Sequence, residues 1–333
     1  MNLLIEQSFD PRHNLAREEL LLSKADTDTL YLWRNRSSVI IGRNQNTLAE
    51  VDEEAARKED IRIVRRITGG GAVFQDLGNI NFSYVFPRGD SEEKYREAMQ
   101  MILEFIRKAG AECYFSGRND ICLLDRTGRQ VKIGGTAMTC RDEGGIFHAC
   151  LLFDTYLSQL SRVLTPYREK LQSKGISSVR SRVSNLREET ERLSNLSGDD
   201  FFALWADELK KSCTVIEQVC AGEDVSIQKL IEEKYGNDQW NFGKNPRCNL
   251  KNICRFPSGT AEVYLEVSGG EIRQCVCRGD YFCTEEFFAL ENSMRGISFD
   301  KREIEKVLRD IDTETLFGTA DYERIVNFLL CRK

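Results

Sequence analysis

Residues 65–76, RRITGGGAVFQD, carry the strongest local signal in this sequence. Three consecutive glycines lack Cβ atoms, so their backbone N–H groups can approach a ligand closely. Arg65 and Arg66, directly before them, carry paired N–H donors that suit a phosphate or a carboxylate. The run has neither the Gly-Lys-Ser/Thr of a P-loop nor the glycine spacing of a dinucleotide fingerprint. It therefore predicts an anion-binding loop or a glycine-rich hairpin with solvated arginines, and composition alone favours the hairpin.

The segments around this loop predict alternating helices and strands. Asp10 and Pro11 are typical of a helix start, as N-cap and first helical residue. Thr47 and Glu50 match a capping box and predict a helix that runs to about Lys58. Strands are expected at residues 30–33, 39–42, 61–66 and 80–86.

A long amphipathic helix is expected to begin at Asp90, with Glu93 in its first turn, and to end at Gly110. Four apolar residues recur on one face of it at helical spacing and are assigned to the core. They are Tyr95, Met99, Ile102 and Ile106.

Further along the chain, the next forty residues predict antiparallel ribbons with turns at 125–129 and 141–145. Residues 201–216 predict a helix again. Alternation at 261–267, followed by Gly269 and Gly270, predicts a hairpin into 272–276.

The fold class predicted from these elements is α+β. A catalytic domain with mixed and antiparallel sheets and helices is expected at 1–243, and a small α/β accessory domain at 248–333. A break with few apolar residues at 243–247 separates the two.

The composition limits the class of protein. The chain has 333 residues, of which 41% are hydrophobic and 30% charged, and its formal net charge is −6. These values indicate a soluble globular protein and argue against nucleic-acid or polybasic membrane partners. The N-terminus lacks the cationic head of a signal peptide, so a cytoplasmic location is expected, with the twelve cysteines as reduced thiols. Only two histidines are present, which gives a zinc site little support.

A second candidate region combines Gly117-Arg118-Asn119-Asp120 with the strand 131–137. In an extended strand, Lys132 points to the face opposite Val131 and Ile133. If that face lines a cleft, Lys132 is a point charge beside the ligand, and Asp120 could hold Mg²⁺ or a ligand hydroxyl. Otherwise Lys132 is an ordinary solvated lysine. His148 on the next strand, taken by itself, is typical of a hydrogen-bonded structural histidine.

A third region is residues 174–186, KGISSVRSRVSNL, which contain Arg180, Arg182 and several hydroxyl groups. Taken alone, this segment is typical of a surface connection.

Together these motifs closely resemble the lipoate–protein ligase family. The resemblance is strong over about residues 5–187 and weaker to about 283, and several motifs in one order are more specific than any single one. The matching stretches are Leu32-Trp33-Arg34-Asn35, Ile41-Gly42-Arg43, residues 65–76, Gly117 to Asp120, Lys132 with its glycines, residues 174–186, Trp240-Asn241-Phe242-Gly243-Lys244 and Gly279-Asp280.

The resemblance implies a fold shared with biotin ligases and octanoyltransferases, plus a small C-terminal domain. It implies ATP and Mg²⁺ as cofactors, lipoate as substrate, and lipoyl domains or a glycine-cleavage carrier protein as acceptor partners. The resemblance implies that Arg66 contacts the nucleotide, that the backbone of Gly71, Ala72, Val73 and Phe74 cradles it, and that Lys132 is the central catalytic lysine. It also implies that a loop carrying Arg180 and Arg182 folds over the adenylate. The implied lipoyl pocket lies near Trp33, Thr68 and His148.

Two single positions and one four-residue stretch depart from the family pattern. Gln75 stands where members often have histidine, Thr68 replaces a common serine, and residues 147–150 read Phe-His-Ala-Cys in place of the frequent His-His-Gly-Thr. These departures concern the pocket and leave Arg66 and Lys132 in place.

The expected reaction is ATP-dependent ligation of lipoate to an acceptor lysine through lipoyl-AMP. Two alternatives stay open. An ATP-independent octanoyl or lipoyl transferase of the same fold would use a cysteine nucleophile, and Cys113 is its candidate. A non-catalytic lipoyl-binding paralogue is the other.

Overall fold

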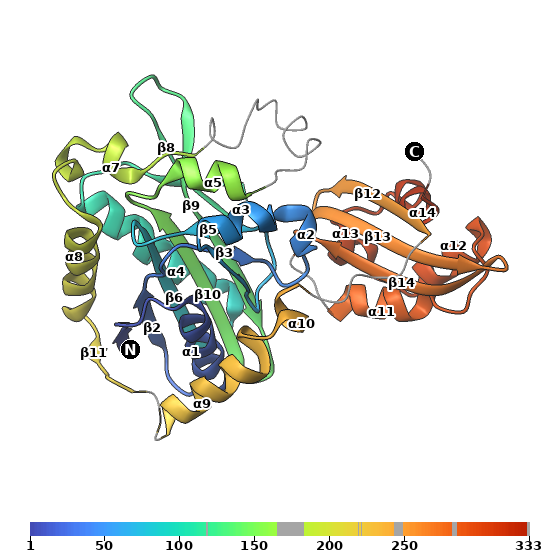
Figure 1. Ribbon diagram of the computed structural model, residues 1–333, viewed down its shortest axis with the longest axis horizontal. Helices are drawn as coiled ribbons and strands as arrows, with labels where there is room; N and C mark the ends of the chain where they lie inside the picture. The colour runs from blue at the N-terminus through green and yellow to red at the C-terminus, as the bar shows by residue number, and fades with distance from the viewer. Residues whose placement is uncertain are drawn as a thin grey trace. The chain divides into compact units, whose positions relative to one another are not determined.

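The structure is a computed structural model that describes residues 1–117, 119–164, 183–218, 220, 222–242, 249–281 and 285–331 (Figure 1). The chain folds into two compact units. The first contains Met1–Ile41, Leu48–Ile67 and Val73–Asn241, and the second contains Gly42–Thr47, Thr68–Ala72 and Phe242–Lys333. The second unit thus takes two short segments from the first quarter of the chain, and the domain bounds 1–243 and 248–333 stay a prediction.

An eight-stranded sheet forms the centre of the first unit. Its strand order is β11 (Thr214–Val215), β1 (Asn2–Ile5), β2 (Thr29–Trp33), β6 (Asn79–Pro87), β10 (Gly144–Leu152), β9 (Gln130–Cys140), β8 (Asp120–Leu124) and β7 (Tyr114–Ser116). β1 pairs in parallel with both β11 and β2, and the remaining pairs are antiparallel. A three-stranded sheet lies beside it in the order β4 (Arg62–Arg65), β3 (Ser38–Ile41) and β5 (Val73–Gln75).

Helices cover both faces of the large sheet, and the alternating side chains of β2 show which helices lie on which face. Leu30 and Leu32 belong to one apolar cluster, together with residues of α4 (Ser91–Lys108) and α8 (Gly198–Lys210). Tyr31 and Trp33 belong to another, with α1 (Pro11–Ser23) and with Ile227 of α9 (Glu223–Leu230). Since successive side chains of a strand point to opposite faces, α4 and α8 cover one face, and α1 and α9 cover the other.

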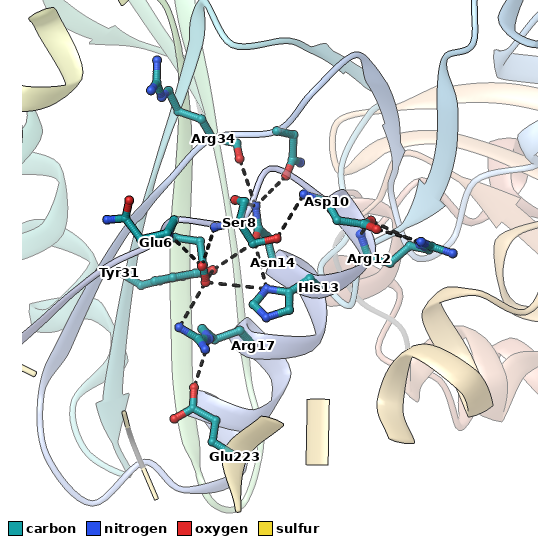
Figure 2. A network of polar contacts seen from close by, with 12 residues as sticks. Glu6, Ser8, Asp10, Arg12, His13, Asn14, Arg17, Tyr31, Arg34 and Glu223 are labelled. Carbon is teal, nitrogen blue, oxygen red and sulfur yellow. Dashed lines mark hydrogen bonds and ion pairs between the residues drawn. The ribbon is translucent and has the colours of Figure 1, made fainter. Parts of the chain in front are cut away.

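A buried polar network fixes α1 against the sheet (Figure 2). The Tyr31 hydroxyl donates to Glu6 Oε2 at 2.8 Å. Arg17 of α1 pairs with Glu6 Oε2 at 3.1 Å and with Glu223 Oε1 of α9 at 3.0 Å. Asn14 Nδ2 donates to the Arg34 carbonyl at 2.9 Å, which ties α1 to the end of β2. Buried charges of this kind are retained when each has a partner.

Several expected element starts are confirmed. α1 begins at Pro11 with Asp10 as its N-cap, and α4 begins after Asp90, whose side chain accepts from Glu92 N and Glu93 N. On α4, Ile102 and Ile106 are buried, and Tyr95 and Met99 pack against the same cluster. The expected strands at 30–33, 39–42, 61–66 and 80–86 correspond to β2, β3, β4 and β6.

Two expected helices are wrong in extent. The segment from Thr47 to Lys58 forms two short helices, α2 (Thr47–Glu50) and α3 (Glu53–Lys58), because Val51 bridges to Leu164 and Asp52 caps α3. The helix expected at 201–216 ends at Lys210, since Thr214 and Val215 pair with β1 instead. Three strands were missed: β1, β5 and β12 (Leu250–Phe256).

The second unit carries an antiparallel sheet in the order β12, β13 (Gly259–Ser268) and β14 (Glu271–Gly279). The predicted hairpin turn is confirmed at Gly269 and Gly270, whose φ angles are +61° and +79°. Helices α11 (Glu285–Met294), α12 (Lys301–Arg309), α13 (Thr313–Phe317) and α14 (Tyr322–Leu329) follow and share one apolar core with the sheet.

The other described elements of the first unit are α5 (Leu157–Val163), α7 (Leu186–Glu189), η1 (Glu191–Leu193), the π-helical turn η2 (Ile231–Tyr235) and α10 (Asp238–Asn241). Within the described ranges, no helix combines the length and apolar character that crossing a membrane requires.

Candidate active site

Strand register brings residues from five strands into one row. Trp33 lies opposite Asn81, Asn81 opposite Cys150, Cys150 opposite Gly135, and Gly135 opposite Asp120. Directly opposite residues point to the same face of a sheet. This row therefore lies on the face covered by α1. Neighbouring strands are about 4.8 Å apart, so the row spans roughly 19 Å.

Lys132 joins this face through a bulge in β9. The register of β8 against β9 shifts, so that Ile121 faces Gly134 whereas Cys122 faces Lys132, and Ile133 is the extra residue. Val131 and Ile133 are buried in the core on the α4 side. Lys132 points the other way, and its Nζ lies 2.7 Å from Asp120 Oδ1. The predicted orientation of Lys132 is confirmed, and the structure brings Lys132 and Asp120 together.

Close contacts surround the two glycines after Ile133. A Cβ on Gly134 would lie 2.5 Å from the Cys150 carbonyl oxygen, and a Cβ on Gly135 would lie 3.0 Å from Lys132 Nζ. Side chains at these positions would therefore push β9 from β10 or displace the lysine. The Lys132 carbonyl accepts from Ser184 N at 2.9 Å, which fixes the backbone beside the ammonium group.

His148 lies on the same face and is bound to a buried carboxylate. Its Nδ1 lies 3.1 Å from Glu18 Oε1, which also accepts from Ser83 Oγ at 2.5 Å. Ser83 Oγ in turn accepts from Trp33 Nε1 at 2.9 Å. The structure thus joins two predicted pocket residues, Trp33 and His148, through Ser83 and Glu18.

Glu18 was missed by the sequence analysis. Its side chain is fully buried, and Oε2 has no hydrogen-bond partner among the described residues. An unpaired buried oxygen of this kind is costly unless a bound group satisfies it. The available signal was its position, because Glu18 follows Leu15 by three residues and precedes Leu22 by four, which is a core position on α1.

Arg66 directly follows β4 and is 5% exposed. Its backbone N–H donates to Ile41 O at 2.9 Å and its Nη1 donates to Ile40 O at 3.2 Å. Burial lowers the pKa of Arg66 to about 10, and electrostatic interaction with Cys150 and Glu18 acts in the opposite direction. Arg66 is therefore a buried cation at neutral pH that acts electrostatically on the sheet face carrying Cys150.

The glycine loop divides between the two units. Val73 and Phe74 lie in β5 of the first unit, whereas Thr68, Gly71 and Ala72 group with the second. In the second unit, Thr68 O accepts from Arg43 N at 2.8 Å.

Gly70 has a φ of +88°, and a Cβ on Gly42 would lie 2.0 Å from the Gly70 carbonyl oxygen. Glycine at position 42 thus allows the close approach to the Gly70 carbonyl group, and glycine at position 70 allows the positive φ angle. Arg180 and Arg182 lie outside the described residues.

Asp120 has the chemistry of a magnesium ligand. Mg²⁺ is commonly held by one or two carboxylates, with phosphate oxygens and waters filling the other positions. Within the part of the chain that the structure describes, no group of three or more His, Cys, Asp or Glu residues could hold a metal ion. Asp120 fits a site that the phosphates of a substrate would complete.

Cys113 lies away from this face. It is 3% exposed in the cluster on the α4 side, with its Sγ 4.0 Å from the Leu103 carbonyl oxygen. Burial raises the pKa of the Cys113 thiol to about 12. Because the thiolate is the reactive form, this environment disfavours a nucleophile.

A lysine–aspartate pair, a buried arginine and a carboxylate–histidine pair beside Trp33 have the charge and hydrogen-bonding groups that suit an anionic substrate. Comparisons with known proteins give the class. Residues 10–210 match the family described as lipoyl protein ligase A/B catalytic domain, and residues 245–329 match the bacterial lipoate protein ligase C-terminus. The chain belongs to the lipoate–protein ligase family.

Individual relatives agree with this assignment. Lipoate-protein ligase LplJ of Bacillus subtilis is 33% identical over 328 residues, which cover 96% of this chain and 97% of the relative. The bipartite lipoate protein ligase of Thermoplasma acidophilum, solved with its E2 lipoyl domain, is 28% identical, with a TM-score of 0.62 over 75% of this chain and 98% of that one. A lipoate-protein ligase A bound with ATP is 27% identical, with a TM-score of 0.61 over 73% and 98%.

Proposed function

We propose that this lipoate–protein ligase adenylates lipoate with ATP and then transfers the lipoyl group to a lysine of an acceptor protein. The observation that carries the proposal is the Lys132–Asp120 pair, 2.7 Å apart, on the sheet face that also carries His148 and Trp33. A cation fixed there can act on both the phosphate and the carboxylate of the substrates.

The first half-reaction brings two anions together. A carboxylate is a poor acyl donor because its negative charge deactivates the carbonyl carbon, so it must exchange an oxygen for AMP, with pyrophosphate leaving. Arg66 and Lys132 would neutralise the charge that accumulates on the α-phosphate and the lipoate carboxylate. Asp120 would hold Mg²⁺ together with phosphate oxygens, and this ion would supply further positive charge.

The second half-reaction is attack of a neutral acceptor lysine on the mixed anhydride. Lys132 would donate a hydrogen bond to the oxygen on which negative charge develops and to the departing phosphate. The segment with Arg180 and Arg182 would close over the adenylate and exclude water. That role, like the cradle at Gly71, Ala72, Val73 and Phe74, rests on the family resemblance.

The lipoyl tail needs an apolar slot, since burial contributes roughly 0.8 kcal/mol per methylene. Trp33 and His148 lie on the face where such a slot would run, and Thr68 joins them by resemblance. A lipoyl domain of a 2-oxoacid dehydrogenase or a glycine-cleavage carrier protein is the proposed acceptor. The Thermoplasma acidophilum ligase solved with its E2 lipoyl domain supports this choice.

The transferase alternative is disfavoured by the buried Cys113 thiol, whose raised pKa leaves little thiolate. The decisive assay is lipoate-dependent exchange of pyrophosphate with ATP, which an ATP-independent transferase and a non-catalytic paralogue would both lack.

Lys132→Ala should slow lipoyl-adenylate formation by about 10² to 10³, or roughly 3–4 kcal/mol, as removal of a preorganised donor typically does. Transfer from preformed lipoyl-adenylate should also slow. The melting temperature should barely change, because a partly exposed ion pair contributes little stability. Pyrophosphate exchange, single-turnover transfer and thermal melting on one preparation measure all three.

Lys108→Ala is the matched control, since Lys108 also forms an ion pair, with Glu208 at 2.8 Å, on an exposed surface. It should leave both rates unchanged. Near-normal rates in the Lys132 variant, or loss of its fold, would rule out the catalytic assignment.

A further inference from the structure

The motif that begins Trp240-Asn241 has no role in the site described above. Both residues belong to α10, close to the end of β4. β4 is an edge strand of the three-stranded sheet, and its one partner among the described strands is β3. Since Arg66 N donates to Ile41 O of β3, the N–H and C=O of Arg65 point to the unpaired side of β4. Such edge groups need partners from outside the sheet.

Trp240 and Asn241 supply these partners. Asn241 Oδ1 accepts from Arg65 N at 2.9 Å, and Trp240 Nε1 donates to Arg65 O at 2.8 Å. The Arg65 side chain donates two further hydrogen bonds, from Nε to Trp240 O at 2.8 Å and from Nη2 to Asn241 O at 3.0 Å. Four hydrogen bonds thus hold the residue that precedes Arg66.

Trp240 and Asn241 thus form a clamp on Arg65, and further contacts fix the clamp on the side away from Arg65. Asn241 Nδ2 donates to Tyr235 O at 2.9 Å, and the Tyr235 hydroxyl donates to Glu19 of α1 at 2.8 Å. Lys234 Nζ lies 2.7 Å from Glu19 Oε2 and 4.2 Å from the centre of the Trp240 ring. Asn241 is 5% exposed. The clamp therefore connects β4 to α1, the helix that carries Glu18.

We propose that Asn241 and Trp240 are positioning residues for Arg66, which they hold in register by clamping Arg65. This inference rests on the proposed function, in which Arg66 neutralises the reacting anions. Consecutive Cα atoms are about 3.8 Å apart, so a shift of Arg65 moves the base of the Arg66 side chain directly. A misplacement of about 1 Å can reduce a rate by around 10²-fold.

Asn241→Leu tests this, because leucine is close to asparagine in size and removes both carboxamide bonds. Lipoate-dependent pyrophosphate exchange, corrected for folded fraction by thermal melting, should fall by about tenfold or more. Asn241→Asp keeps an acceptor for Arg65 N and should lose less. Asn252→Leu is the control: Asn252 Nδ2 donates to Phe328 O at 2.9 Å in the second unit, so its loss should lower stability but leave exchange kinetics normal.

A double-mutant cycle with Arg66→Lys separates this inference from the function on which it rests. If Asn241 acts through Arg66, Asn241→Leu should reduce exchange by less than about threefold in the Arg66→Lys background. A normal rate for Arg66→Lys alone would overturn the proposed role of Arg66. If Arg66→Lys is slow and its rate reduction multiplies with that of Asn241→Leu in the double variant, the positioning role is overturned. A normal rate for Asn241→Leu alone would also overturn it. Either result would overturn the positioning role only.

If Asn241→Leu fails to fold, Trp240→Phe provides the same test, because it keeps an aromatic side chain and removes the indole N–H that donates to Arg65 O. It should reduce exchange in the wild-type background and have little effect with Arg66→Lys. Equal reductions in both backgrounds would contradict the proposal.

Discussion

Gly135 is the residue that leaves room for the Lys132 ammonium. A Cβ at this position would lie 3.0 Å from Nζ and 3.3 Å from Cε of the lysine. Gly135 does not have the positive φ that disfavours other residues, so the backbone accepts alanine there. The obstructed atoms are the far end of a flexible side chain, which can move away without disturbing the core.

Gly135→Ala should therefore fold normally but move Lys132 from Asp120. We expect adenylation to slow by roughly tenfold or more, since misplacing a catalytic group by about 1 Å can reduce a rate by around 10²-fold. Pyrophosphate exchange and the melting temperature measure the two effects.

Gly89→Ala is the control, because a Cβ there would meet only the Pro87 carbonyl oxygen, at 3.8 Å. Unchanged adenylation in Gly135→Ala would mean that the position of the ammonium is not fixed by this glycine.

Two neighbouring acidic residues of α1 serve different elements. Glu18 binds Ser83 and His148 on the sheet, whereas Glu19 accepts from Lys234 Nζ and the Tyr235 hydroxyl of η2. Burial by itself would raise the pKa of Glu19, but the Lys234 charge and hydrogen bonds from Lys234 and Tyr235 outweigh it. The pKa of Glu19 is therefore lowered from its ordinary value of 4.5.

Glu19→Gln should destabilise the protein at neutral pH by about 2 kcal/mol, because hydrogen bonds to a charged group are lost. A lowered carboxyl pKa stabilises the fold above the ordinary value, and this contribution disappears as the pH falls through the lowered pKa. The difference in unfolding free energy between wild type and variant should hence narrow at acid pH. Urea unfolding across a pH series measures it.

Glu217→Gln serves as the control, because the Glu217 side chain is exposed, and it should change stability little at any pH. A difference for Glu19→Gln that stays constant as the pH falls would contradict the lowered pKa.

At the scale of the whole molecule, each unit has its own core. Among the described residues, the buried members of the apolar cluster of the second unit lie between Phe256 and Leu330. Segments 42–47 and 68–72 join this unit through polar contacts, such as Gly279 N to Asn44 O at 2.7 Å, and add nothing to that core.

Residues 242–333 should accordingly fold when expressed alone, with a stability on the order of 5 kcal/mol. Thermal unfolding followed by circular dichroism should show one cooperative transition. Phe317→Ala, which removes a fully buried ring, should cost about 3–5 kcal/mol and nearly abolish the transition. A fragment without any cooperative transition would show that its core depends on the rest of the chain.

Features that depend on neighbouring residues could be predicted from the sequence alone. Asp10 and Asp90 mark helix starts because their side chains cap N–H groups within a few residues. Lys132 points away from Val131 because strand alternation is local. The motifs also indicated the family, which the comparisons confirm, and with it the general arrangement of helices and sheets.

Features that depend on residues far apart in the sequence became visible in the folded chain. The bridge from Val51 to Leu164 divides an expected helix, the pairing of Thr214 with β1 ends another, and Asn241 meets Arg65 across 176 positions. The bulge that holds Lys132 beside Asp120 arises from the pairing of β8 with β9, and the burial of Glu18 from its packing against β6 and β10. Local sequence does not encode these contacts, because each depends on which segments the folded chain brings together.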